Sequence, residues 1–438
     1  MSLKTFPGGL HPPDNKHWSE HRPIEDCPLP EELVIPLSQH IGAPAEACVA
    51  VGDTVRKGQE VGRAKGFVSV PVHAATSGEV TAVEARLHPS GRKLAAVVLR
   101  PDGEDAWAEA PTKDDPEQLG PDAIRDKIRT AGIVGLGGAT FPTHVKLSPP
   151  EGKVIDTLIL NGVECESYLT ADHRLMLEET ERILDGIAIL QKVLGVKRSV
   201  VGIEANKPDA IAAMRKACTP RGIEVAELAV KYPQGAEKQL ILALTGKEVP
   251  SGGLPMDVGV VVQNVGTAVA VSDAVRFGRP LVERIATVSG PAVAEPKNLR
   301  VRIGTPLAHL VAQCGGTTVD PAKIVMGGPM MGTAQLSLEA PVIRGTSGLL
   351  LFGPGQFPLQ KEGPCIRCGR CVQVCPARIL PTTIAAYARL DFMDEAEDFD
   401  AMDCIECGCC TYTCPASIPL VQAIRQAKGA ILAKRRKV

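Results

Sequence analysis

The amino-acid sequence contains no long uninterrupted run of hydrophobic residues. The nearest approach, residues 258–271, is interrupted by Gln263, Asn264 and two glycines, and it falls short of the roughly 18 apolar residues that a membrane-spanning helix needs. The first nine residues also lack the charged region, apolar core and small-residue cleavage site of a signal peptide. We therefore expect a cytoplasmic chain that reaches a membrane only through partner proteins.

Neither sign of charge dominates the sequence, and aromatic residues are scarce. Lysine and arginine number 48 against 50 aspartates and glutamates, and aromatics make up 3% of the chain. Proteins that bind nucleic acid usually carry a basic excess, and those that bind single strands stack bases on aromatic rings. The composition therefore argues against a nucleic-acid partner. The length of 438 residues and the hydrophobic fraction of 44% instead predict about two to four globular domains.

Cysteine, by contrast, is plentiful and follows a pattern. Of the fourteen cysteines, eight form two copies of the run C-x2-C-x2-C-x3-C-P. These eight are Cys365, Cys368, Cys371, Cys375, Cys404, Cys407, Cys410 and Cys414. Thiolates at this spacing hold 4Fe-4S clusters, and the fourth cysteine of each run binds the cluster of the other run. The sequence therefore predicts two clusters with crossed ligands.

The crossed pattern divides the eight cysteines into two sets. The first set is Cys365, Cys368, Cys371 and Cys414, and the second is Cys404, Cys407, Cys410 and Cys375. Zinc prefers two separated pairs of cysteines and disulfides belong to oxidising compartments, so neither explains a full run that occurs twice. Cys409 breaks the spacing and is left out of both sets. Cysteines that bind metal also indicate a reducing compartment.

The first 110 residues divide into an arm and a small β domain. Residues 1–30 are rich in proline and glycine and are expected to be irregular. Residues 31–110 alternate short β-type runs with turn signals, which predicts a sandwich or barrel. Residues 51–62 resemble the repeat of biotinyl and lipoyl carrier domains, which implies a barrel-sandwich fold. The residues around Lys65 differ from those of a carrier, which favours a structural role over a modified lysine.

The next region, residues 115–282, alternates apolar strands with helices. Strands are expected near residues 154–160, 199–203 and 258–262, and helices near residues 122–131, 174–194 and 267–277. Buried strands separated by helices indicate a parallel sheet with helices on its faces, as in a Rossmann-like domain.

Three further segments complete the expected organisation. Residues 283–345 return to short strands around one helix at 307–314, which indicates a β-grasp (SLBB-like) module. Residues 346–363 contain several glycines and prolines and are expected to be a linker. Residues 364–438 contain both cysteine runs and are expected to form a two-cluster ferredoxin-like domain. The predicted fold class is therefore multidomain α/β with additional small β domains.

Three segments of residues 115–282 contain groups that a flavin site would use. In the first, glycines would let backbone N–H groups approach a phosphate, and a lysine follows closely. The second comes directly after an apolar strand, where open α/β sheets bind ligands. The third combines a loop near residue 235 with the end of another strand. The candidate residues are Gly135, Gly137, Gly138, Phe141, Lys146, Asn161, Glu164, Glu166, Gly235, Glu237, Gln263, Asn264 and Thr267.

Each segment also has a simpler explanation. The glycine-rich stretch has Thr140 where the dinucleotide fingerprint requires its third glycine, and a plain turn would look the same. Glu164 and Glu166 fit an ordinary acidic loop. Gln263 and Asn264 fit a cap on the next helix. The residues alone leave these alternatives open.

The three segments together resemble the flavin-carrying subunit of the NADH dehydrogenases, including that of respiratory complex I. In that family the glycine-rich loop ends in Phe-Pro-Thr, as at Phe141, and an Asn-x-x-Glu-x-Glu motif matches the one that starts at Asn161. The resemblance implies FMN binding, with Phe141 near the nicotinamide and Glu166 in contact with the dinucleotide. Two departures are Leu136, where the family has a basic residue, and Ala236, where it has a glutamate.

Over its whole length the chain resembles the RnfC family of the Rnf-type ion-translocating ferredoxin:NAD oxidoreductases. Residues 6–16, 161–174 and 232–253 and both cysteine runs support this resemblance. It implies a peripheral subunit on the cytoplasmic side of the inner membrane, which exchanges electrons between NAD(H) and its partners through FMN and two 4Fe-4S clusters. The implied partners are membrane subunits of the same complex and a ferredoxin-type subunit. A flavin suits this role because it exchanges electrons in pairs or singly.

Three other hypotheses remain at this level. A cobalamin reductase of a bacterial microcompartment resembles the same flavin and cluster regions, and neighbouring genes for membrane subunits would argue against it. A non-catalytic electron relay, whose α/β domain has lost its cofactor, is compatible with the changes at Leu136 and Ala236. A flavin absorbance band would exclude that relay. A carrier protein modified on Lys65 would show an increment in its intact mass.

Overall fold

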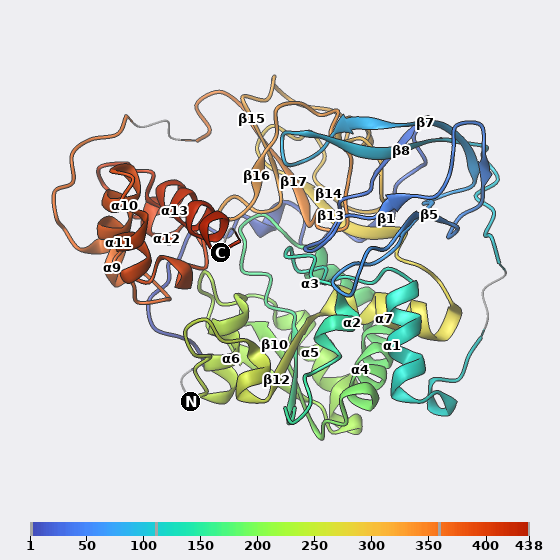
Figure 1. The fold of residues 1–438 in the computed structure, drawn as a ribbon, viewed down its shortest axis with the longest axis horizontal. Coiled ribbons are helices and arrows are strands. Elements are labelled where there is room, and N and C mark those ends of the chain that lie inside the picture. The colour runs from blue at the N-terminus through green and yellow to red at the C-terminus, as the bar shows by residue number, and fades with distance from the viewer. Residues whose placement is uncertain (1–2, 110–112, 358–360, 437–438) are drawn as a thin grey trace.

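The structure is a computed structural model that describes residues 3–109, 113–357 and 361–436. None of the helices within those ranges is long and apolar enough to cross a membrane. Figure 1 shows an α/β layer at the bottom, β-rich parts at the top, and a helical part at the left that ends near the C-terminus.

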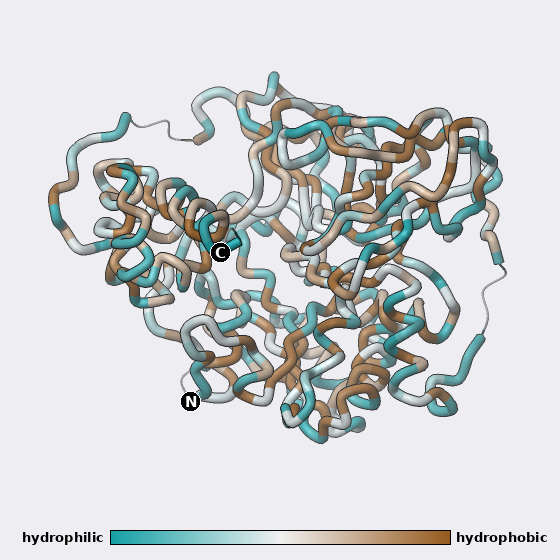
Figure 2. The backbone as a smooth tube through the Cα atoms, viewed as in Figure 1, coloured by the Kyte–Doolittle hydropathy of each residue, from teal (hydrophilic) through white to brown (hydrophobic). Residues whose placement is uncertain are grey.

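A four-stranded parallel sheet lies at the centre of the α/β layer, with the order β11-β10-β9-β12. Its strands are β9 (Thr157–Asn161), β10 (Arg198–Glu204), β11 (Glu224–Leu228) and β12 (Val260–Asn264). Successive side chains point to opposite faces, so Leu158 and Leu160 join one buried core and Ile159 joins another. Figure 2 shows hydrophobic segments gathered inside this layer. The strands are apolar on both faces because helices cover both.

Most helices of this layer share the core of Leu158 and Leu160. They are α1 (Pro121–Thr130), α4 (Thr180–Leu194), α5 (Pro208–Cys218) and α7 (Val265–Phe277), whereas α6 (Glu237–Thr245) contributes to the core of the other face. Gly186 of α4 permits close packing on α7, because an added Cβ would lie 2.0 Å from the carbonyl oxygen of Ala268. The short helix α2 (Thr143–Lys146) follows the glycine-rich stretch.

One sequence-based expectation is wrong in this layer. The apolar spacing predicts a single helix over residues 174–194, but the structure has α3 (Ala171–Glu178) and α4, separated at Glu179. Both helices pack against α5 and α7, and α3 packs in addition against strands β1 and β13 of another sheet. The break at Glu179 accompanies these additional contacts of α3. Ion pairs from Glu179 to Arg182 and Arg300 hold the junction.

The region 31–110 contains two small antiparallel sheets around one core, with the orders β2-β8-β7-β4 and β3-β5-β6. The strands are β2 (Leu33–Pro36), β3 (Glu46–Ala47), β4 (Thr54–Val55), β5 (Glu60–Arg63), β6 (Val72–His73), β7 (Gly78–Leu87) and β8 (Lys93–Pro101). Ile35, Val61 and Val97 are completely buried in the core that the sheets share. Short strands at regular intervals are therefore present as the turn signals predict.

A mixed six-stranded sheet unites distant parts of the chain, in the order β1-β14-β13-β17-β15-β16. Its strands are β1 (Ile24–Asp26), β13 (Glu283–Ser289), β14 (Lys297–Arg302), β15 (Lys323–Met326), β16 (Thr333–Ala334) and β17 (Gly348–Phe352). Helix α8 (Leu307–Gln313) packs in the core of this sheet.

This sheet corrects two further expectations. The N-terminal arm is not irregular throughout, because β1 pairs with β14 and the one-turn helix η1 (Lys16–Trp18) precedes it. The expected linker at 346–363 contains β17, whose five residues are all buried between β13 and β15. Flanking glycines and prolines suggest a linker, but burial of this apolar run in the sheet determines its structure. Residues 358–360 lie outside the described residues.

The C-terminal part is helical. Its helices are α9 (Arg370–Gln373), α10 (Pro381–Arg389), α11 (Met393–Asp398), α12 (Cys409–Tyr412) and α13 (Leu420–Arg435). Ile384, Ile424 and Ile431 form much of its buried core, against which several of the predicted cluster cysteines pack. Helices α9 and α12 occupy equivalent places in the two cysteine runs.

Candidate flavin and iron–sulfur sites

The carboxyl ends of β9 and β12 bring two predicted residues together. Asn161 and Asn264 are register partners on these adjacent parallel strands. The Asn161 Nδ2 group donates to the carbonyl oxygen of Gly235 at 2.8 Å, so the loop before α6 is drawn to the same edge. This is the edge at which open α/β sheets bind ligands.

The side-chain amides of Gln263 and Asn264, at the end of β12, differ in their hydrogen bonds. Asn264 caps α7, because its Oδ1 accepts the N–H of Gly266 at 2.8 Å, and its Nδ2 donates to Asp172 Oδ2 at 2.7 Å. Gln263 is 2% exposed, and its Nε2 has no hydrogen-bond partner among the described residues. Burying a polar group without a partner is unfavourable. Gln263 is therefore the amide with a donor left for a ligand.

The glycine-rich stretch forms a closed loop beside these strand ends. The N–H of Gly135 donates to the carbonyl of Phe141 at 2.9 Å, and the N–H of Leu136 donates to Thr267 Oγ1 at 2.9 Å. Between these anchors Gly137 and Gly138 are exposed. Thr140, which replaces the expected third glycine, has a φ of 50°. This left-handed conformation explains why a glycine would suit that position.

Lys146 and Glu237 form an ion pair that joins α2 to the start of α6. The Lys146 ammonium lies 2.6 Å from Glu237 Oε1 and 3.1 Å from the carbonyl oxygen of Val262. Both side chains are partly exposed. The structure thus brings the three predicted segments to one edge of the sheet.

Glu164 and Glu166 are placed differently from the other candidates. The Glu164 carboxylate accepts the N–H groups of Asp172 and His173 at the start of α3. The Glu166 carboxylate accepts the N–H groups of Met330 and Met331, at 3.0 and 2.8 Å, from the loop after β15. Burial raises the pKa of Glu166 to about 7, while these two N–H groups oppose the shift. Glu164 therefore connects the segment after β9 to α3, and Glu166 connects it to the loop after β15.

Sequence reasoning missed two charged groups behind the site. Asp172 holds the amide of Asn264, and burial, followed by the nearby Glu164 charge, raises its pKa to about 7. Arg284 of β13 donates to the carbonyls of Arg344 and Leu136, and so supports the glycine-rich loop from behind. Burial lowers the pKa of Arg284 to about 10. Arg284 lies in β13, and the sequence of this strand contains no motif that predicts a binding residue.

The second predicted set of cysteines surrounds one cavity. Cys375, Cys404, Cys407 and Cys410 line it, together with Cys409 and apolar residues such as Ile379 and Ile424. Cys375 belongs to the first run, yet it is an electrostatic neighbour of Cys404, Cys407 and Cys410. The described residues hold no group of three or more His, Cys, Asp or Glu suited to a single metal ion. A 4Fe-4S cluster does not require its ligands to converge on one ion, because each thiolate binds a different iron. Four cysteines around a cavity are compatible with such a cluster.

The first set is more open. Cys365 and Cys368 are exposed, Cys414 is half-buried and Cys371 is buried. The two runs nevertheless share an unusual backbone, with positive φ angles at matching positions. These are Arg367 (54°) and Glu406 (58°), Gly369 (74°) and Gly408 (78°), and Arg378 (57°) and Ser417 (53°). The first run is therefore shaped like the second.

Several contacts join the α/β layer to the cysteine-rich part. Tyr232 donates its O–H to the carbonyl of Cys407 at 2.8 Å, and Gln239 Nε2 donates to the carbonyl of Pro376 at 3.4 Å. Tyr232, Cys407 and Cys409 form a small buried cluster that also touches Cys165. The Cys165 Sγ accepts the N–H of Gly235 at 3.4 Å. Residues of both candidate sites are thus linked within one chain.

Four family models match successive parts of the sequence. The RnfC barrel sandwich hybrid domain matches residues 4–104, and the Nuo51 FMN-binding domain matches residues 128–273. The SLBB domain matches residues 285–334, and a 4Fe-4S dicluster domain matches residues 358–415.

Curated relatives are similar over nearly the whole chain. The chain is 50% identical over 428 residues to the C subunit of the proton-translocating ferredoxin:NAD(+) oxidoreductase complex of Clostridium ljungdahlii, covering 97% of this chain and 94% of that protein. It is 48% identical to the C subunit of the Na(+)-translocating ferredoxin:NAD(+) oxidoreductase complex of Acetobacterium woodii, covering 100% of both. Among solved structures, an NAD+-reducing NiFe hydrogenase in the H2-reduced state is 19% identical with a TM-score of 0.49, covering 73% of this chain and 62% of that one.

Proposed function

The chain belongs to the RnfC family, the C subunits of ion-translocating oxidoreductase complexes, and we propose that it exchanges electrons between NAD(H) and the rest of such a complex through FMN and two 4Fe-4S clusters. The observation that carries this proposal is the direct contact between the two candidate sites. The loop that bonds Asn161 through Gly235 also bonds Cys407 through Tyr232. FMN, when bound, supplies the conversion between paired and single electrons.

The residues at the sheet edge fit FMN. The unpaired Nε2 of Gln263 offers a donor to an acceptor on the ring edge or phosphate. The exposed Gly137 and Gly138 allow a phosphate to approach the backbone, and Lys146 adds a positive charge nearby. The proposed FMN residues are Gly135, Gly137, Gly138, Lys146, Asn161, Glu164, Gly235, Glu237, Gln263, Asn264 and Thr267.

Phe141 and Glu166 are the proposed contacts of the nicotinamide nucleotide. Phe141 closes the glycine-rich loop and is only partly buried. Glu166 already accepts two backbone N–H groups, so a contact with the dinucleotide requires it to share or release one of them. Hydride transfer needs no protein acid or base, and no proton donor is assigned.

The proposed cluster ligands follow the crossed pattern. Cys404, Cys407, Cys410 and Cys375 hold the cluster beside the α/β layer, and Cys365, Cys368, Cys371 and Cys414 hold the other. The exposed Cys365 and Cys368 suit a cluster that faces a partner protein. We therefore order the path as flavin, the Cys404 cluster, the Cys365 cluster and then a ferredoxin-type subunit.

Finer assignments belong to the same proposal. The parallel sheet supports a Rossmann-like fold for residues 115–282, and the strands around α8 support a β-grasp fold for residues 283–345. The remaining domain limits are 31–110 for the barrel sandwich and 364–438 for the cluster domain. The partners are membrane subunits of the same complex and a ferredoxin-type subunit, with this chain peripheral on the cytoplasmic side of the inner membrane.

The experiment is anaerobic reconstitution of the full chain with iron, sulfide and FMN. We expect one flavin and about eight irons per chain, bleaching of the flavin by NADH, and reduction of ferricyanide. FMN-loaded protein that NADH does not reduce would refute the nicotinamide assignment. Bound zinc in place of iron would refute the clusters, and an iron–sulfur protein that takes up no flavin would indicate the electron relay.

A further inference from the structure

The backbone that follows β9 has an irregular course. Residues 163–169 belong to no helix or strand, and Glu164 and Tyr168 have φ angles of 50° and 67°. Buried carbonyl groups in such a segment need partners from elsewhere. The segment also touches the proposed flavin residues, because Asn161 Oδ1 accepts the N–H of Val163 at 3.2 Å and Cys165 accepts the N–H of Gly235. Its shape therefore affects the flavin site.

Lys16 of the N-terminal arm satisfies three of these carbonyls. Its Nζ lies 2.9 Å from the oxygen of Glu164, 3.0 Å from that of Glu166 and 2.5 Å from that of Leu169. Lys16 is 2% exposed. A lysine ammonium has three protons to donate, and here each has one acceptor. The contact spans about 150 positions of sequence.

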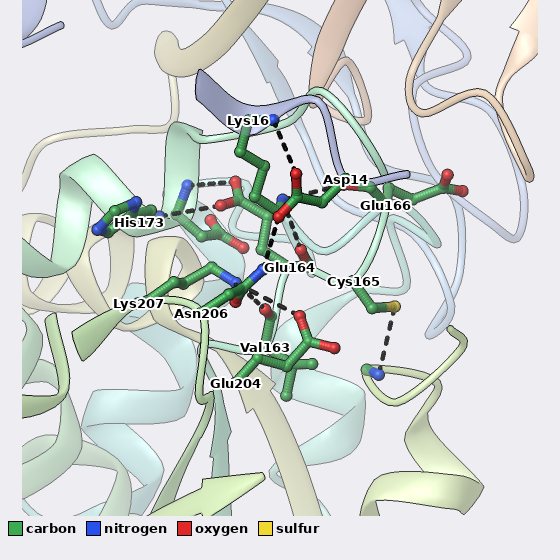
Figure 3. Close-up of polar contacts among 12 residues, drawn as sticks. Asp14, Lys16, Val163, Glu164, Cys165, Glu166, His173, Glu204, Asn206 and Lys207 are labelled. Atoms are coloured by element: carbon green, nitrogen blue, oxygen red, sulfur yellow. Dashed lines mark hydrogen bonds and ion pairs between the residues drawn. The ribbon is translucent and has the colours of Figure 1, made fainter. Parts of the chain in front are cut away.

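A second buried lysine holds the same segment. Lys207 is 0% exposed, and its Nζ lies 2.8 Å from the carbonyl oxygen of Val163, 3.0 Å from Asn206 Oδ1 and 3.4 Å from Glu204 Oε2. Figure 3 shows the two lysines reaching the segment from different elements. Their ammonium groups together bind four of its carbonyls.

Negative groups surround these two cations. Glu164, Glu166 and Glu204 lie around Lys16 and Lys207, and the carboxyl of Asp172 lies near Lys207. Burial lowers the pKa of Lys16, Lys207 lowers it further, and Glu164 and Glu204 oppose the shift. Carboxylates near a bound flavin would oppose the negative charge that it gains on reduction. The ammonium groups of Lys16 and Lys207 would offset that repulsion.

We propose that Lys16 is a positioning residue of the flavin site, which holds segment 163–169 in its flavin-binding shape and supplies positive charge that favours the reduced flavin. This inference rests on the proposed function. It makes the N-terminal arm part of the flavin site, although the arm lies outside the α/β region in sequence. Lys207 performs the matching role from the opposite end of the segment.

Two substitutions of Lys16 test the proposal in the reconstituted full chain. Lys16→Met removes the charge and all three donors, while Lys16→Gln removes the charge and keeps an N–H donor. We measure the FMN dissociation constant and, at saturating FMN, the flavin midpoint potential. Loss of charge-assisted hydrogen bonds should weaken FMN binding about tenfold or more, and loss of the cation should make the potential more negative. Iron content should not change.

Lys4→Met is the matched control on the same arm. The Lys4 side chain is 43% exposed and forms a 3.5 Å surface ion pair with Glu224, which contributes little. It should match the wild type in both measurements. An unchanged midpoint potential in the Lys16 variants would overturn the proposal, and so would failure of both variants to fold, since Lys16 would then serve folding alone. If the wild type itself takes up no FMN, the proposed function fails instead.

Discussion

Tyr232 donates its phenolic O–H to the backbone carbonyl of Cys407 at 2.8 Å, and is itself only 1% exposed. The N-terminal arm reinforces this junction, because Leu10 and Tyr232 exchange two backbone hydrogen bonds of 2.7 and 2.8 Å. The preceding Gly9 donates its N–H to the carbonyl of Val374 at 2.8 Å, next to Cys375. A few buried hydrogen bonds thus determine how the proposed flavin site lies against the proposed Cys404 cluster.

Tyr232→Phe should weaken this junction without removing either cofactor. An unpaired buried carbonyl costs about 1–3 kcal/mol, so we expect a loss of unfolding free energy of that order and slower electron transfer from flavin to clusters. Rapid mixing with NADH, with flavin and cluster absorbance followed separately, measures the rate. Tyr412→Phe, at a 55% exposed tyrosine of α12, should behave as the wild type. Equal cluster-reduction rates in Tyr232→Phe and the wild type would contradict this role.

Single cysteine substitutions test the crossed ligation. Cys375→Ser should remove the same cluster signal from the electron paramagnetic resonance spectrum as Cys404→Ser, although the two residues belong to different runs. Cys414→Ser should likewise match Cys365→Ser. Cys409→Ser is the control, since Cys409 lines the cavity but lies outside the spacing, and it should retain both clusters. If Cys375→Ser instead resembled Cys365→Ser, each run would bind its own cluster.

Lys146→Met should reduce FMN affinity. Lys146 pairs with Glu237 and lies at the strand end beside Val262, and a hydrogen bond to a charged group contributes about 1.5–3 kcal/mol. We expect the FMN dissociation constant to rise about 10- to 100-fold, as measured by fluorescence quenching. The control is Lys153→Met, which removes a more exposed ion pair with Asp257. An unaltered dissociation constant would exclude Lys146 from the site.

Glu166 should make stability depend on pH. Its pKa is raised to about 7 in the folded protein, whereas an unfolded glutamate titrates near pH 4.3. Between about pH 4.5 and 7 the folded state therefore keeps a proton that the unfolded state has lost, and stability falls as pH rises. Because glutamine does not titrate, Glu166→Gln should make this decrease in unfolding free energy about 1–3 kcal/mol smaller.

Thermal unfolding at about pH 5.5 and pH 8 measures the effect of Glu166. Glu151→Gln, at an exposed position outside helices and strands, is the matched control. Its pH dependence should follow the wild type. A Glu166→Gln protein with the wild-type pH dependence would show that Glu166 keeps its ordinary titration.

Elements that depend on neighbouring residues could be predicted from the sequence, whereas elements that depend on contacts between distant segments could not. The apolar runs at 199–203 and 258–262 predict β10 and β12 well, because a buried strand needs apolar residues at successive positions. The strand β17 was missed, since its structure depends on pairing with β13 and β15 from earlier in the chain. The division of helix 174–194 likewise accompanies contacts of α3 with β1 and β13, which come from distant parts of the chain.

The same distinction between local and long-range contacts applies to the candidate sites. Asn161 and Asn264 could be placed together because both end apolar strands of one parallel sheet. Lys16 and Tyr232 stand in segments that support the family resemblance, but the roles of their side chains could not be predicted, and Arg284 gave no signal. Each of the three side chains contacts a backbone group more than 100 positions away in the sequence. No local spacing records such a contact.

The sequence by itself predicted the cluster chemistry of this protein, since eight cysteines occur at a repeated spacing that is typical of iron–sulfur ligands. It also determined the strand-end amides and glycines that suit a flavin. Only the tertiary structure decided that the Cys404 run packs against Tyr232 and that the arm inserts Lys16 beneath the segment after β9. The physical reason is that the type of cluster which the cysteines bind depends on the spacing of neighbouring residues. Contacts between distant segments depend instead on which buried surfaces pack together and which buried hydrogen-bonding groups pair across the whole fold.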